Sequence, residues 1–310
     1  MNSGLILGKY QVIRELGRGG MGQIYLVRDI NMGTFWALKV VLKDPRNSVN
    51  YYAEFNILRR LNHPSIVKMF NFFEDQNYIY IIEEFVDGIN LEQYLRQVRR
   101  LPELVIVSIA RQICNVLLYL HSQRPNPIVY RDMKPANIML MRDGRIKIVD
   151  FGIAREYKQY ARNDTMLGGT RGYAAPEQYG NAQTDVRADI YSLGVTMYHM
   201  ASGLGPNDPP YEILPVRQFD PNFSEGLEEI IFRCTRLNPD NRYQDIRQVL
   251  QALSDIERQR YRRGKGSGLK TALWVLFLTA ILGVLFFGFW QYKDNITEMI
   301  SNIIGTISGT

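Results

Sequence analysis

Two short segments decide how this sequence is interpreted: YRDMKPAN at residues 130–137, and DFG at residues 150–152, which begins thirteen residues after Asn137. Together they supply two aspartates, a lysine and an asparagine. Mg2+ prefers a few carboxylate or amide oxygens combined with phosphate oxygens, and a further carboxylate can take the proton of a hydroxyl group. Two turns rich in Asp, Asn and Gly are the ordinary alternative. Eight specified positions at fitting spacing favour a magnesium site beside a general base.

A glycine-rich turn, GRGGMG, lies upstream at residues 17–22. Glycines let backbone N–H groups approach a phosphate without a Cβ clash, although a plain hairpin turn is the alternative. A dinucleotide-binding fold would need a helix after the turn, whereas residues 24–27 (IYLV) indicate a strand. Lys39 ends the stretch WALK (residues 36–39) in the next predicted strand. Glu54 follows on a predicted helix, where its carboxylate could orient the Lys39 ammonium towards phosphates.

The distribution of apolar residues divides the first 257 residues into two parts. The first is rich in short β-branched and aromatic runs, which predict strands: Tyr10–Leu16, Gln23–Asp29, Thr34–Val41, Val67–Glu74 and Tyr78–Phe85, with a helix at Ser48–Leu61. The second has helical periodicity: Leu104–His121, Asp189–Ser202, Glu225–Arg236 and Tyr243–Ile256. A strand-rich part followed by a helical part predicts an α+β fold of two lobes, about 10–86 and about 87–257.

The positive charge of the chain is concentrated in one short segment. The chain has 310 residues and a net charge of +6, and residues 258–270 hold six Arg and Lys with no acidic residue. We therefore expect no nucleic-acid partner, because such binding needs a basic face spread over a domain. Cys114 and Cys234 lie in apolar helical patterns and are expected to be core thiols.

A transmembrane helix is predicted at residues 271–291. Residues 272–290 contain no charge and no proline, and their 19 residues span roughly 28 Å as a helix, close to the thickness of a bilayer core. Trp274, Trp290 and Tyr292 lie near its ends, as interfacial aromatic residues do. A buried core helix is the alternative, but few residues follow that could cover it.

Charges around this span predict its orientation. The basic linker at 258–270 precedes it, so the positive-inside rule places the larger domain in the cytoplasm and residues 292–310 outside, in a single-pass protein of the cell membrane. The same cations favour an anionic lipid surface. The 292–310 tail has Ile296, Met299, Ile300, Ile303 and Ile304 at helical spacing. A helix that lies along the membrane surface or pairs with a partner, and a short frayed extension, fit it equally well.

The quoted motifs resemble those of the eukaryotic-like protein kinases found in bacteria. The resemblance runs from about Tyr10 to Leu253 and includes APE at 175–177, DIYSLG at 189–194 and NPDNR at 238–242. It implies a bilobal fold, at residues 10–257, that transfers the γ-phosphate of ATP to Ser or Thr of proteins, with Mg2+, or alternatively Mn2+, as the ion. It also implies that Arg242 pairs with Glu177.

The resemblance implies a role for each motif residue. Asp132 orients the substrate hydroxyl and accepts its proton, Lys134 stabilises the transferred phosphoryl group, and Asn137 and Asp150 bind the metal ions. Lys39 contacts the α- and β-phosphates and pairs with Glu54. The implied nucleotide-binding residues are Leu16, Gly17, Gly19, Gly22, Ile24, Ala37, Lys39, Glu84 and Val86, with residues 84–86 as the hinge that recognises adenine.

Regulation and selectivity are implied in the same way. Thr170 matches a threonine that supports the choice of Ser/Thr, and Arg131 marks kinases that are switched by phosphorylation of the activation loop, for which Thr165 is the expected acceptor. A homodimer that phosphorylates itself is an open alternative. Two residues depart from the family pattern: Tyr130 stands where His is commoner, and Glu83 stands at the back of the adenine pocket, where an apolar residue is usual.

Two competing functions remain open. A catalytically weak pseudokinase acting as a membrane scaffold would have the same fold, but Lys39, Glu54, Asp132, Asn137 and Asp150 are all present. A small-molecule kinase of related fold usually lacks the pattern found at residues 168–177. A column of Leu58, Met69, Tyr130 and Phe151 is expected to align the lobes, and the same residues equally fit an ordinary core.

Overall fold

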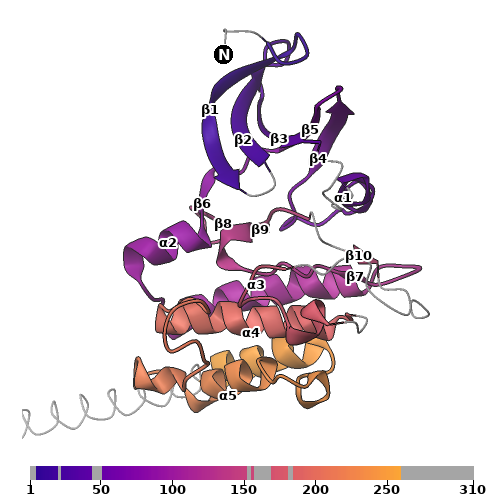
Figure 1. The fold of residues 1–310 in the computed structure, drawn as a ribbon. Helices are drawn as coiled ribbons and strands as arrows, with labels where there is room; N and C mark the ends of the chain where they lie inside the picture. The colour runs from indigo at the N-terminus through magenta and orange to yellow at the C-terminus, as the bar shows by residue number, and fades with distance from the viewer. Residues whose placement is uncertain are drawn as a thin grey trace, which may run out of the picture. The chain divides into compact units, whose positions relative to one another are not determined.

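The computed structural model describes residues 5–19, 22–43, 51–151, 155–156, 169–180 and 184–259. The chain divides into two compact units, residues 1–256 and 257–310. The first unit contains two lobes, a β-sheet lobe and a helical lobe, as the sequence predicted (Figure 1). The predicted membrane span at 271–291 and the tail at 292–310 lie outside the described residues.

The first lobe is a five-stranded antiparallel sheet in the order β1-β2-β3-β5-β4. Its strands are β1 (Tyr10–Gly19), β2 (Gly22–Asp29), β3 (Phe35–Leu42), β4 (Met69–Glu74) and β5 (Tyr78–Glu84). They are rich in β-branched and aromatic residues, which pack well on a pleated surface. β1 extends into the glycine-rich segment and pairs with β2 from Tyr10–Asp29 to Gly19–Gly22.

Helix α1 (Tyr51–Leu58) packs beside β4 (Figure 1). It ends three residues earlier than predicted. Arg60 N–H donates to Ile57 and Leu61 N–H donates to Leu58, so the last turn tightens into three-residue hydrogen bonds, as helix ends commonly do. The beginning of the predicted helix lies outside the described residues.

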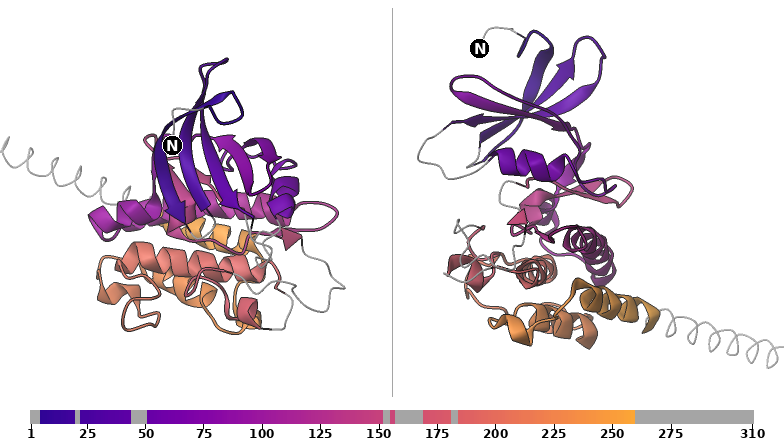
Figure 2. Two further views of the ribbon diagram at one scale, coloured as in Figure 1. Left: turned by 45° about the horizontal axis from the view of Figure 1, so that its top comes forward. Right: turned by 90° about the vertical axis from the view of Figure 1, so that its right-hand side faces the viewer.

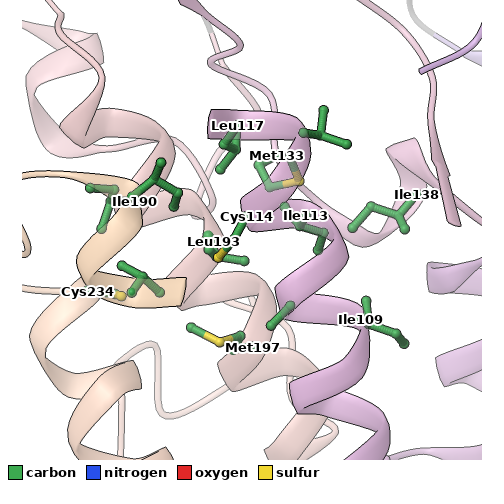
Figure 3. Close-up of a cluster of buried hydrophobic side chains, with 14 of the residues drawn as sticks. Ile109, Ile113, Cys114, Leu117, Met133, Ile138, Ile190, Leu193, Met197 and Cys234 are labelled. Carbon is green, nitrogen blue, oxygen red and sulfur yellow. The ribbon is translucent and has the colours of Figure 1, made fainter. Parts of the chain in front are cut away.

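The second lobe is built on long helices, which Figure 2 shows layered beneath the sheet. They are α2 (Leu91–Val98), α3 (Glu103–His121), α4 (Arg187–Ser202), α5 (Glu225–Cys234) and a last helix over residues 246–259. Figure 3 shows Cys114 and Leu117 of α3 on the side of that helix facing Leu193 of α4, in the hydrophobic core. Gly194 permits close packing of α4 on the end of α5, because a Cβ there would lie 2.5 Å from Cys234 Cβ.

Among the described residues, α3 is the one helix long and apolar enough to cross a bilayer. Ile106, Ala110 and Leu117 are among its many buried residues, and they belong to the core of the second lobe. The apolar composition of α3 is therefore explained by its packing in the core of the second lobe. Cys114 and Cys234 are both buried and free, as expected for core thiols.

The second lobe also contains short strands that periodicity did not predict. β6 (Gly88–Asn90), β8 (Ile138–Met141) and β9 (Ile146–Ile148) form one sheet, and β7 (Ile128–Val129) pairs with β10 (Arg155–Glu156). With two to four residues each, these strands are too short for an alternating pattern to be recognised. The β8–β9 pair places YRDMKPAN before one strand, and Asp150 and Phe151 of the DFG motif after the other.

Candidate active site

Asp132 lies at the centre of a hydrogen-bond network in the loop between β7 and β8. Its Oδ2 accepts from Lys134 Nζ and from Asn137 Nδ2, both at 2.8 Å, and its Oδ1 accepts from Thr170 Oγ1 at 2.7 Å. Lys134 Nζ also donates to Thr170 Oγ1 at 2.5 Å. Charge-assisted bonds of this kind fix the carboxylate in one orientation. The structure thus brings together four residues that the sequence analysis selected.

The backbone of this loop is anchored by Asp189, at the start of α4. The Asp189 carboxylate is fully buried and accepts from the Tyr130 N–H at 2.9 Å and the Arg131 N–H at 2.7 Å. His121 Nε2 lies 2.9 Å from the same carboxylate. Arg131 adopts a φ of 70°, a left-handed conformation that a non-glycine residue rarely adopts without support. Asp189 supplies part of that support.

Tyr130, which stands where the family commonly has His, is a buried structural residue. Its hydroxyl donates to the Val149 carbonyl at 2.7 Å, and its ring meets Phe151 edge-on at 4.9 Å between centroids. Burial, followed by the negative charges of Asp132 and Asp150, raises the pKa of this hydroxyl well above its usual range, so the hydroxyl remains a donor. Leu58 belongs to the same hydrophobic cluster as these two rings, and Met69 packs against it.

Lys39 and Asp150 meet between the lobes. The Lys39 ammonium, on β3, lies 3.1 Å from Asp150 Oδ1, just after β9. The lysine side chain is 7% exposed and the aspartate side chain 30% exposed, so the pair opens to solvent on the aspartate side. The ammonium of Lys39 thus reaches the DFG aspartate directly. The side chain of Glu54 lies outside the described residues, and its expected pairing with Lys39 stays a prediction.

Asn137 and Asp150, the expected metal ligands, carry oxygen donors of the kind that Mg2+ prefers. The described residues contain no group of three or more His, Cys, Asp and Glu side chains that would hold an ion by themselves. Mg2+ does not need such a group, because it takes few protein ligands together with phosphate oxygens. Asn137 and Asp150 offer an amide and a carboxylate, and their segments are joined by the Val149 N–H to Asn137 carbonyl bond of 3.0 Å. This donor set fits a magnesium ion.

Gly22 is a position of the glycine-rich hairpin that only glycine can fill. Gly22 adopts a φ of 139°, and a Cβ on it would lie 2.2 Å from the Val40 carbonyl oxygen of β3. A Cβ on Gly17 would meet nothing within 4 Å. The ladder pairs Gly19 with Gly22 and Gly17 with Ile24, and it has a register shift at Leu16. Gly22 therefore fixes the hairpin on the sheet, whereas Gly17 has open space beside it.

The end of β5 carries two glutamates with different environments. Glu83 is buried opposite Ala37 of β3. Opposite residues of an antiparallel pair share a face of the sheet, and so do residues two apart on one strand. Glu83, Ala37 and Lys39 therefore lie on the same face. Glu84 Oε2 accepts from Lys147 Nζ at 2.7 Å, and the Glu84 N–H donates to the Lys68 carbonyl at 2.8 Å. Val86 lies in the connection between β5 and β6.

The segment at 169–180 contacts the catalytic loop at a second point. Gln178, which is 4% exposed, donates from Nε2 to the Arg131 carbonyl and accepts from the Ala175 N–H, both at 3.0 Å. Glu177 and Arg242 form the expected pair, through two bonds of 2.7 and 2.8 Å.

Sequence reasoning missed Gln178, His121 and Lys147, since single polar residues carry no signal in spacing. Thr165 lies outside the described residues.

Comparison with known proteins agrees with this geometry. Residues 10–253 match the protein kinase domain family. The chain is 29% identical over 278 residues to the serine/threonine-protein kinase PrkC of Bacillus subtilis, covering 83% of this chain and 42% of that protein. It is 34% identical over 261 residues to a probable serine/threonine-protein kinase of Streptomyces coelicolor, covering 76% and 38%. It is 35% identical over 205 residues to cAMP-dependent protein kinase type 3 of Saccharomyces cerevisiae, covering 64% and 50%.

The chain spans less than half of the length of the bacterial relatives named above. The match to the family nevertheless covers both lobes, from the first strand of the sheet to the last described helix. The residues gathered around Asp132 and Asp150 fall inside it. The chain belongs to the protein kinase domain family.

Proposed function

We propose that this protein is a membrane-anchored serine/threonine protein kinase that transfers the γ-phosphate of ATP to Ser or Thr hydroxyls of proteins. The observation that carries the proposal is the network on Asp132, whose carboxylate is held by Lys134, Asn137 and Thr170 from two separate segments. A carboxylate held in this way is suited to orient an incoming hydroxyl and to accept its proton. The names of the bacterial relatives support the choice of Ser and Thr.

The side chains divide the work of the reaction between them. Lys39 offers its ammonium to the phosphates of the nucleotide, and Lys134 lies beside Asp132, where positive charge stabilises a phosphoryl group in transfer. Asn137 and Asp150 would hold Mg2+, which would neutralise phosphate charge. The hairpin with Gly17, Gly19 and Gly22 covers the phosphates, and Leu16, Ile24, Ala37, Glu84 and Val86 enclose the adenine. The two lobes act mainly by positioning the nucleotide phosphates and the acceptor hydroxyl. This suits the loose transition state of phosphoryl transfer.

An assay of phosphate transfer tests this function. The full-length protein in detergent micelles is incubated with γ-labelled ATP, Mg2+ and casein, and incorporation into casein and into the chain itself is measured. We expect transfer by the wild type and its loss in Asp132→Ala, with ATP binding retained. Asp143→Ala serves as the matched control, since Asp143 lies exposed in the β8–β9 turn and pairs with Arg145. Nucleotide binding without transfer by the wild type would instead identify a pseudokinase scaffold.

Membrane anchoring is the second part of the proposal. The uncharged 272–290 stretch and the basic 258–270 segment support a single span with residues 1–270 in the cytoplasm. Cysteines introduced singly at Ser267 and Ser301 test it with a thiol reagent that does not cross membranes. We expect labelling of intact cells or spheroplasts at position 301 and not at 267. Labelling at both positions, or at neither, would contradict a single span with this orientation.

Autophosphorylation is the third part. Arg131 next to Asp132 supports activation by a phosphate in the loop that contains Thr165, because an arginine can pair with such a phosphate. Mass spectrometry of the wild type and of Asp132→Ala, each after incubation with ATP, tests this. We expect phosphate on Thr165 in the wild type alone. Active enzyme with an unmodified Thr165 would contradict activation through this residue. Mixing active and inactive chains would show whether one copy phosphorylates another.

A further inference from the structure

An exposed arginine follows directly after the threonine that contacts Asp132. Thr170 Oγ1 lies 2.7 Å from Asp132 Oδ1, and the next residue, Arg171, is exposed. Within the part of the chain that the structure describes, no carboxylate lies within ion-pair distance of the Arg171 guanidinium. This cation therefore faces solvent beside the place where an acceptor hydroxyl must be presented to Asp132.

The backbone that carries Arg171 is held firmly. Asn207 Nδ2 donates to the Arg171 carbonyl at 3.1 Å. Gly172 follows with a φ of 86°, and a Cβ there would lie 2.7 Å from the ring of Pro206. The Tyr173 hydroxyl lies 2.6 Å from His199 Nδ1 of α4. With its backbone tied on both sides, Arg171 cannot move away from the catalytic loop as a residue of a loose loop could.

Tyr179 presents an aromatic ring on the same segment. It ends the short 3-10 helix Pro176–Tyr179 and is 49% exposed, while its neighbour Gln178 is buried and bonded to the Arg131 carbonyl. Burial and the negative charge of Asp132 raise the pKa of the Tyr179 hydroxyl, and the positive charge of Arg171 lowers it. The Tyr179 side chain thus lies within electrostatic reach of both the catalytic carboxylate and this arginine.

The acidic residues nearby do not neutralise Arg171. Asp208 and Glu92 act electrostatically on Tyr173 and His199, and the Asp208 carboxylate accepts from the Gly205 N–H at 2.7 Å. Neither forms an ion pair with Arg171 in the described structure. The guanidinium is therefore available to a carboxylate or phosphate of another molecule, for which its planar donor group is well suited.

We propose that Arg171 determines substrate specificity, by selecting acceptor segments with an acidic side chain close to the Ser or Thr that is phosphorylated. An extended chain advances about 3.3–3.6 Å per residue, so with the acceptor hydroxyl at Asp132 the neighbouring one to three residues pass within reach of an arginine side chain. The Tyr179 ring supports the segment from the side. This inference rests on the protein kinase function proposed above and names the class of its substrates.

A positional peptide library tests the inference. Ser and Thr peptides carry Glu, Ala or Lys at each of three positions on either side of the acceptor, and kcat and KM are measured for the full-length protein in detergent. At one or more positions we expect Glu to exceed Lys about three- to tenfold in kcat/KM, mainly through KM, as for a solvent-exposed ion pair. High salt should reduce the preference, because it screens exposed charges.

Variants at the same position complete the test. Arg171→Gln should abolish the preference for Glu, and Arg171→Glu should reverse it towards Lys. Arg236→Glu is the matched control, because Arg236 is also exposed but lies over Phe232 near the end of α5, and it should keep the wild-type preference. Equal use of Glu and Lys peptides by the wild type, or an unchanged preference in Arg171→Glu, overturns this inference but leaves the proposed kinase function standing. A wild type that labels neither peptides nor itself overturns the proposed function as well.

Discussion

The Glu84 carboxylate at the end of β5 accepts a 2.7 Å hydrogen bond from the Lys147 ammonium on β9, and this ion pair connects the sheet lobe to the helical lobe. The Lys147 side chain is 11% exposed and that of Glu84 30% exposed. Glu84 Oε2 also lies 3.3 Å from the Lys68 N–H. The connection between the lobes is thus fixed by charge as well as by the continuous chain.

Replacing Lys147 by methionine should therefore destabilise the protein. The change keeps the length of the side chain but leaves a half-buried carboxylate without its ammonium, which costs about 1–2 kcal/mol. We expect the Tm to fall by about 2–6 °C for a domain of this size. Arg145→Met is the control: its partner Asp143 is solvent-exposed, and the Tm should hardly change. Equal Tm values for the two variants would speak against a role for the Glu84 pair.

Thr170→Val should lower the catalytic rate while leaving nucleotide binding intact. The variant keeps the shape of the side chain but removes the hydroxyl that bonds to both Asp132 and Lys134. Without it the carboxylate is less well oriented, and we expect kcat to fall roughly 10- to 100-fold, part of what a positioned general base contributes. Thr170→Ser retains the hydroxyl and should restore most of the rate. A Ser variant as slow as the Val variant would show that the methyl group matters instead.

Gly22→Ala should disturb the hairpin, whereas Gly17→Ala should not. A methyl group at Gly22 would overlap the Val40 carbonyl, and an L-residue is strained at a φ of 139°, whereas a methyl group at Gly17 meets nothing within 4 Å. We expect Gly22→Ala to cost about 1–3 kcal/mol of stability and to raise the KM for ATP. The Tm of Gly17→Ala should stay close to that of the wild type. Equal tolerance of both substitutions would contradict the contact with β3.

The stability of the protein should decrease on acidification because of His199. Burial lowers the pKa of this imidazole below its ordinary 6.5, although Asp208 and Glu92 act in the opposite direction. The unfolded state therefore binds more protons than the folded state in the region below pH 6.5. The stability contribution is fully present above the unfolded pKa and is lost as the pH falls through the lower folded pKa.

Thermal unfolding between pH 5 and 7.5 measures this effect. His199→Gln, whose amide can still accept a hydrogen bond from Tyr173, should show a shallower fall in Tm on acidification than the wild type. The pKa of His63 is also lowered, by burial and by Lys147, so His63→Gln is measured in parallel to separate its contribution. A pH dependence that His199→Gln leaves unchanged would mean that other groups control acid stability.

The sequence alone determined the elements whose patterns are local. The five strands of the sheet and the helices near 104–121, 189–202 and 225–236 were predicted within a few residues, because alternation and helical periodicity repeat many times within them. The residues gathered around Asp132 were named from two motifs. The short strands β6 to β10 were not predicted, since pairing with other segments sets their boundaries. The early end of α1 was not predicted either, because its last turn tightens into three-residue hydrogen bonds.

Only the tertiary structure decided which distant polar residues meet. Nothing in the spacing of Asp189, Gln178 or Lys147 indicates that they bind the Tyr130 and Arg131 amides, the Arg131 carbonyl and Glu84. Such contacts join residues tens of positions apart, and they form only when packing of α3 against α4 and pairing of β8 with β9 bring the segments together. A sequence reveals side-chain chemistry and local periodicity. The hydrogen-bond partner that each buried polar group finds is decided by the packed core around it.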